Sequence, residues 1–94
     1  MANLYNVAST IREYCSRCHS FIIHSEQVEL QEMGSYVRVD ITFIIVKDNF
    51  ANDRSAGIRE IRHAEDVARQ SVSYVNQVYD GGPYRIGEIY IVEA

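Results

Sequence analysis

Residues 27–47 read QVELQEMGSYVRVDITFIIVK, two runs of alternating apolar and polar side chains on either side of a glycine. Alternation with a period of two is typical of a strand that buries one of its faces. We therefore predict a strand over residues 27–31, a turn at residues 33–35 and a longer strand over residues 36–47. The unbroken apolar run from Ile41 to Val46 marks the longer strand as the centre of the sheet.

The same alternation assigns each strand side chain to one face of the sheet. We expect the covered face to hold Val28, Leu30, Val37, Val39, Ile41, Phe43, Ile45, Ile89 and Ile91. We expect the open face to hold Glu29, Gln31, Arg38, Asp40, Thr42, Ile44, Val46, Glu88, Tyr90 and Val92. A mixed surface of this kind suits a wet partner interface or a small polar site, although a sheet face that is simply solvated is the more common case.

Two amphipathic helices are predicted around this hairpin. Apolar residues recur at steps of three and four from Leu4 to Cys18, after Asn3 as a capping residue, and again from Ile58 to Tyr79. The second helix should end at residues 80–83, where two glycines and a proline cannot continue it. A polar loop over residues 48–55 should precede that helix, and a last strand over residues 85–92 should follow it.

These elements give the order α-β-β-α-β. A strand-helix-strand crossover is right-handed, so the last strand should lie parallel to the central one, with both helices on one face. We predict an α+β fold over residues 1–94, a single ferredoxin-like domain that lacks the first strand of that fold. Its sheet should have three strands in mixed orientation.

Composition narrows the classes of partner. The chain has 94 residues, 47% of them hydrophobic, and a net charge of -4 with basic residues scattered among acidic ones. This balance argues against nucleic acid or an anionic membrane as the main partner. No apolar run approaches the ~20 residues that cross a bilayer, and the N-terminus lacks the pattern of a signal peptide, so we expect a cytoplasmic protein without direct membrane insertion. The modest core would gain from dimerisation.

Both cysteines lie in Cys15-Ser16-Arg17-Cys18-His19, which matches the C-x-x-C-H spacing of c-type haem attachment. They also lie on the apolar stripe of the first helix, where free cysteines pack as small hydrophobes. Three interpretations stay open: two core thiols, a haem attachment site, or a soft-metal site in which Cys15 and Cys18 bind zinc with His19 or His24.

An enzymatic function has little support in the sequence. No glycine-rich phosphate loop, zinc-protease motif or nucleophile elbow is present. Acidic pairs such as Glu26 with Glu29 are expected to be solvated charge. Tyrosine is abundant, with seven residues, and its ring with a polar tip is favoured at interfaces. The composition therefore favours association over catalysis.

Residues 28–48 resemble the strand, glycine turn, second strand and acidic loop of the cytoplasmic C-terminal domain of cation diffusion facilitator (cation efflux) transporters. Residues 63–68 are similar to the start of that domain's second helix, and residues 89–94 are similar to its last strand with the closing acid. The resemblance implies a homodimer that binds zinc, iron or manganese at the subunit interface. It further implies a regulatory partnership with the membrane part of a transporter.

This chain lacks the metal-binding histidines of that family: the matching positions hold Thr42, Glu65 and Ile91. His63 is two residues from the family's helical histidine, a shift of about 200° around a helix. We therefore predict a different ligand set, in which divalent metal is bound near the dimer interface by carboxylates and histidines. The candidate ligands are Asp40, Glu88, His24 and His63.

Overall fold

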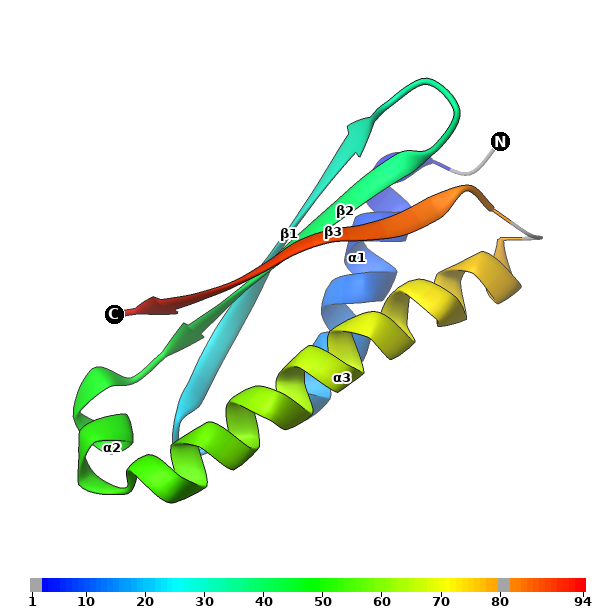
Figure 1. Cartoon of the computed structure of the whole chain (residues 1–94). Coiled ribbons are helices and arrows are strands. Elements are labelled where there is room, and N and C mark those ends of the chain that lie inside the picture. The colour runs from blue at the N-terminus through cyan, green and yellow to red at the C-terminus, as the bar shows by residue number, and fades with distance from the viewer. Residues whose placement is uncertain (1–2, 80–81) are drawn as a thin grey trace.

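The computed structural model describes residues 3–79 and 82–94, which form a three-stranded sheet with helices packed against it (Figure 1). In chain order the elements are α1 (Leu4–Cys15), the short 3-10 helix η1 (Ser16–Cys18), β1 (Ile23–Glu32), β2 (Val37–Ile45), α2 (Lys47–Asn52), α3 (Arg54–Val78) and β3 (Tyr84–Glu93). The α+β class and the three-stranded sheet are as predicted.

The sheet has the order β1-β2-β3, with β1 antiparallel and β3 parallel to the central strand β2. The turn between β1 and β2 contains Gly34 at a φ of 90°, a left-handed conformation that favours glycine. The mixed orientation and the central position of β2 confirm two predictions from the sequence. The strand itself is shorter than predicted, since it begins at Val37 and ends at Ile45.

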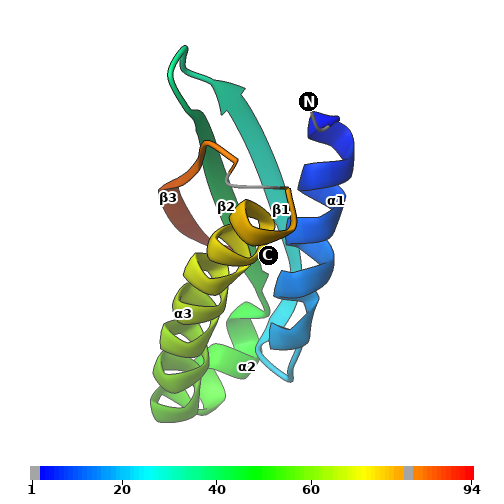
Figure 2. The same cartoon turned by 90° about the vertical axis from the view of Figure 1, so that its right-hand side faces the viewer.

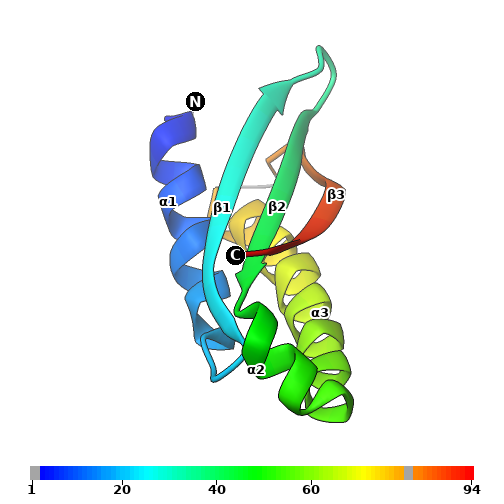
Figure 3. The same cartoon turned by 90° about the vertical axis from the view of Figure 1, so that its left-hand side faces the viewer.

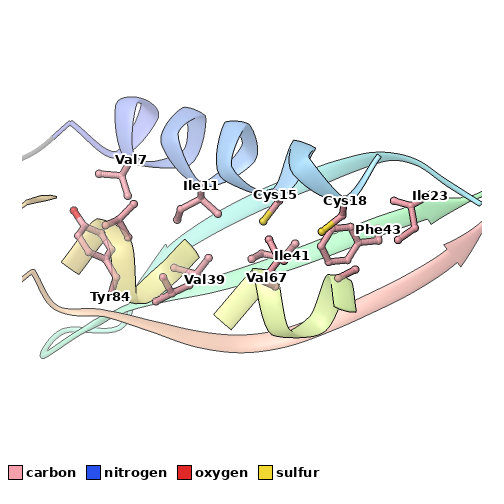
Figure 4. Packing of buried hydrophobic residues seen from close by; sticks show 14 of the residues in the cluster. Val7, Ile11, Cys15, Cys18, Ile23, Val39, Ile41, Phe43, Val67 and Tyr84 are labelled. Carbon is pink, nitrogen blue, oxygen red and sulfur yellow. The ribbon is translucent and has the colours of Figure 1, made fainter. Parts of the chain in front are cut away.

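Both long helices lie on the same side of the sheet, α1 beside β1 and α3 beside β3, and they pack against each other (Figure 2). Figure 4 shows the apolar stripe of α1 and η1 pointing between β2 and α3. The fully buried side chains of the core include Val7, Ile11, Cys15, Val39, Ile41 and Phe43. The stripe at helical spacing is thus the packing face of α1, as the sequence predicts.

The prediction of a loop over residues 48–55 is wrong, because a short helix, α2, occupies residues 47–52. The element order therefore has two helices between β2 and β3, where a single helix was predicted. The ring of Phe50 lies where a Cβ on Gly57 would be, so an aromatic side chain packs α2 closely against the start of α3. A helix this short has too few residues to show a period of 3.6, which explains why the sequence pattern did not reveal it.

Helix boundaries differ from the predictions at other points as well. The α-helical part of the first helix ends at Cys15, and the chain tightens into η1 up to Cys18. The second long helix is capped by Asp53, whose carboxylate accepts a hydrogen bond from the Ala56 amide at 3.1 Å. Of the predicted stop at residues 80–83, Asp80 and Gly81 lie outside the described residues, and α3 ends at Val78.

Candidate functional site

The face of the sheet that points away from α1 and α3 is the first candidate site. Figure 3 views the molecule from this side, where β1, β2 and β3 lie in front of the long helices. Along β2, every second residue from Val37 to Ile45 is buried and every residue between them is partly exposed. The predicted assignment of the two faces is therefore confirmed for the central strand. We call the partly exposed surface the open face; it holds Gln27, Glu29, Gln31, Arg38, Asp40, Thr42, Ile44, Arg85, Glu88, Tyr90 and Val92.

A β-bulge lies at the centre of the open face. The register between β2 and β3 passes from Val39–Ile86 to Ile41–Ile89, so that Gly87 and Glu88 both lie opposite Asp40. The Asp40 carboxylate fills this irregularity, since its Oδ1 accepts a hydrogen bond from the Glu88 amide at 2.7 Å. The bulge is thus held by a side chain of the neighbouring strand.

Arg38 completes this arrangement, because its Nε donates to the same oxygen of Asp40 at 3.0 Å. Burial by itself raises the pKa of Asp40, but the Glu88 amide and the hydrogen bond and charge of Arg38 outweigh it, so the pKa lies below its usual value. Gly87 has no room for a side chain, because a Cβ there would meet Arg38 and Asp40. Asp40 is therefore an ionised group that already has its partners.

The open face is apolar at one end and polar at the other. Ile44 is paired with Val92, and Tyr90 is the next open-face residue of β3, paired with Thr42. Tyr90 and Val92 are each 47% exposed. At the other end, the Arg85 guanidinium lies 5.1 Å from the centroid of the Tyr36 ring. An exposed tyrosine beside two aliphatic side chains is a typical composition for the centre of a protein interface.

Irregularities in β1 and β3 hinder the pairing of another strand at either edge of the sheet. The register of β1 shifts at His24, between Ile23 and Ser25, and β3 carries the bulge at Gly87 and Glu88. Bulges and charged side chains are the devices by which proteins protect sheet edges from pairing. Within the sheet, the open face is therefore a better candidate for contact with a partner than either edge strand.

The four predicted metal ligands are not brought together by the fold. Asp40 and Glu88 are neighbours on the open face, but His24 lies exposed at the start of β1 and His63 lies exposed on α3. Within residues 3–79 and 82–94, no group of three histidine, cysteine, aspartate or glutamate side chains could hold a metal ion. A metal site built from these residues would need ligands from a second copy of the chain.

The two cysteines lie in the core, so that interpretation of the C-x-x-C-H motif is confirmed. Cys15 is 0% and Cys18 is 5% exposed. The Cys15 thiol donates to the Ser71 hydroxyl at 3.6 Å, and burial raises the pKa of Cys15 to about 11. Burial also raises the pKa of Cys18, with a smaller contribution from the charge of Glu26. Both thiols thus lie on the packing face of α1 and η1 with raised pKa values, as expected of core residues, and the haem and soft-metal interpretations stay predictions.

Sequence reasoning missed Glu26, which was expected to be solvated. Its side chain is only 6% exposed, and its carboxylate pairs with the imidazole of His19. The signal was present in the alternation, because Glu26 is in phase with Val28 and Leu30 on the covered face. The pair fastens the end of η1 to β1, which gives His19 a structural role.

Comparison with models of protein families, with curated proteins and with solved structures found no match to this chain. Among the described residues, no helix has both the length and the apolar character needed to cross a membrane. The geometry of the chain's own surfaces is therefore the ground for assigning a function.

Proposed function

We propose that this chain is a non-enzymatic association domain that forms a homodimer through the open face of its sheet. The observation that carries the proposal is the apolar end of that face, where Ile44, Tyr90 and Val92 lie together on the side away from the long helices. A two-fold interface places the same patch of each subunit against its copy. Such pairing would remove both apolar patches from water and leave the charged end at the rim.

Light scattering after size exclusion, at tens of micromolar protein, tests the proposal. We expect a dimer for the wild type and a shift toward monomer for Tyr90→Arg, since a buried unpaired guanidinium weakens association by about tenfold or more. Tyr5→Arg is the matched control, because Tyr5 is 76% exposed on α1 and should leave the dimer intact. A monomeric wild type contradicts the proposal. A dimer that survives Tyr90→Arg contradicts the assignment of the interface to the open face.

A response to divalent cations is the second proposed property, in line with the resemblance to cation efflux transporters. Its support is the adjacency of Asp40 and Glu88 at the centre of the open face, where a two-fold partner would add two more carboxylates. Arg38 beside Asp40 opposes a cation at that position. The metal-free association domain is thus the function that the geometry favours.

Calorimetric titration with zinc or manganese chloride separates the two properties. A response to divalent cations would give binding heat in the wild type and loss of that heat in Asp40→Ala, while His63→Ala tests the contribution of the exposed histidine on α3. Absent heat in the wild type, or unchanged heat in both variants, would leave the metal-free association domain as the better account. The proposal has three further parts: a ferredoxin-like arrangement of the fold without its first strand, a cytoplasmic location that keeps Cys15 and Cys18 reduced, and the membrane part of a transporter as the regulated partner.

A further inference from the structure

The outer side of the helical layer carries a groove that the proposed dimer does not use. Two adjoining hollows of about 330 and 360 Å³ lie between α1 and α3 and share Tyr14 and Tyr74. Figure 2 shows the two helices side by side on the side of the molecule away from the sheet. Besides the two tyrosines, Glu13 and Arg17 line one hollow, and Arg69, Gln70, Ser73 and Gln77 line the other. It is therefore polar, with two tyrosines at its centre.

The two tyrosines and an arginine form a stacked unit. The ring centroids of Tyr14 and Tyr74 are 5.3 Å apart, and the guanidinium carbon of Arg17 lies 4.1 Å from the centroid of Tyr14. Stacking fixes one face of the guanidinium and leaves its N–H edge available for a planar, bidentate acceptor such as a carboxylate. Tyr74 remains 43% exposed. The unit is thus ordered before any ligand arrives, which lowers the entropy cost of binding.

The arginines of the groove lack strong partners. Within the described part of the chain, no carboxylate lies within ion-pair distance of Arg17. Arg69 is 3.6 Å from Asp66, and both side chains are more than half exposed, so solvent screens that pair. Glu13 is the single acid in the lining. The groove therefore offers two guanidinium groups against one carboxylate.

The charges of the strands and of the long helices differ in the same direction. Besides Glu26, which is buried against His19, the strands hold five carboxylates, Glu29, Glu32, Asp40, Glu88 and Glu93, against two arginines, Arg38 and Arg85. Helices α1, η1 and α3 hold six arginines, Arg12, Arg17, Arg54, Arg59, Arg62 and Arg69, against four carboxylates, Glu13, Glu60, Glu65 and Asp66. An acidic partner is thus attracted to the helical side and repelled from the sheet side.

We propose that this groove binds an acidic peptide segment of a partner protein, with a glutamate or aspartate carboxylate on Arg17 and an apolar side chain against Tyr74. Tyrosine and arginine are the residues in which binding energy concentrates at interfaces. The uncharged lining residues, among them Gln70, Ser73 and Gln77, can hydrogen-bond the peptide backbone. Glu13 disfavours a doubly charged phosphate, whereas a single carboxylate can be accommodated beside it.

Fluorescence anisotropy with a short fluorescein-labelled peptide, rich in glutamate and containing one phenylalanine, tests the proposal. The same peptide with glutamine in place of glutamate is the ligand control. We expect binding of the glutamate peptide alone, weakened by about tenfold in Arg17→Ala and also in Arg17→Lys, since lysine cannot offer a bidentate edge. Arg54→Ala, which removes a charge outside the groove, should change the affinity by less than about twofold, the scale of one exposed charge.

Several outcomes would overturn the proposal. These are no binding of the glutamate peptide, equal binding of the glutamine peptide, full affinity in Arg17→Ala, or complete displacement by inorganic phosphate at the peptide's own concentration. The measurement is repeated in Tyr90→Arg, where binding should persist because the groove and the open face lie on opposite sides of the molecule. Loss of binding in Tyr90→Arg would show that the peptide occupies the sheet face and contradict the groove.

Discussion

Packing of the core explains the residues on one face of β2 but not those on the other. Val39, Ile41 and Phe43 are 0% exposed and pack against the helices, so the requirement for a core accounts for them fully. Asp40, Thr42 and Ile44 alternate with them on the same strand, and packing within the chain leaves them partly exposed. One strand thus carries a face that folding explains and a face that it does not. Residues of the second kind are where a function of this domain is to be sought.

Truncation of the largest buried side chain should have the largest effect on stability. Phe43→Ala removes a ring that is 0% exposed and leaves a cavity between β2 and the helices. We expect a loss of about 3 to 5 kcal/mol in the free energy of unfolding. Thr42→Ala, on the neighbouring residue of the open face, should cost less than about 1 kcal/mol. Urea denaturation of both variants measures the difference, and similar losses would remove the distinction between the two faces.

The covered side also contains the thiol of Cys15, whose titration should appear in the pH dependence of the free energy of unfolding. The pKa of Cys15 is raised from 9.0 to about 11 by burial, so the unfolded chain releases this proton before the folded chain does. The stabilising contribution is complete below pH 9 and is lost as the pH rises toward 11. We expect the free energy of unfolding to fall by about 2 kcal/mol between neutral pH and pH 10.5 through this thiol.

Cys15→Ala provides the comparison, because other groups titrate in the same range. The variant should be less stable at neutral pH but should lose less stability on going to pH 10.5. Parallel pH profiles for wild type and variant would contradict the account. A native thiol that reacts with a maleimide as fast as the denatured one would contradict the burial of the cysteine itself.

The covered face was also the part that the sequence predicted well. Alternation in residues 37–45 and the stripe that includes Cys15 arise from burial, which acts on every residue of an element and leaves a repeated pattern. Features formed by individual side chains that are not part of a repeat left no such pattern. Examples are the contact of Phe50 with Gly57 between α2 and α3, and the contact of Tyr14 with Tyr74 in the helical groove, from distant parts of the chain.

A glycine-to-alanine substitution, which most exposed positions would tolerate, should destabilise the bulge on the open face. In Gly87→Ala the added Cβ meets the side chains of Arg38 and Asp40, so their hydrogen bond must break or the bulge must shift. We expect a loss of about 1 to 2 kcal/mol, measured by thermal unfolding. Gly57→Ala is the comparison, because the obstacle there is the ring of Phe50 and the loss should be at least as large. An unchanged melting temperature in Gly87→Ala would mean that Arg38 simply moves aside.

The smallest expected effect concerns the charge of Asp40. Because its pKa is lowered in the folded state, Asp40 contributes stability above the ordinary aspartate pKa, and this contribution disappears as the pH falls through the lower value. Asp40→Asn should therefore flatten the acid side of the stability profile below about pH 4, the ordinary aspartate value. At neutral pH it should cost about 1 kcal/mol, the usual size of one partly exposed hydrogen-bonded group. Denaturation from pH 7 downward, with Glu88→Gln as the control for an exposed acid on the same face, measures both effects. If Asp40→Asn abolishes the dimer while leaving the monomer's stability unchanged, Asp40 acts at the interface and not on the bulge, and the open face then has no structural residue at its centre.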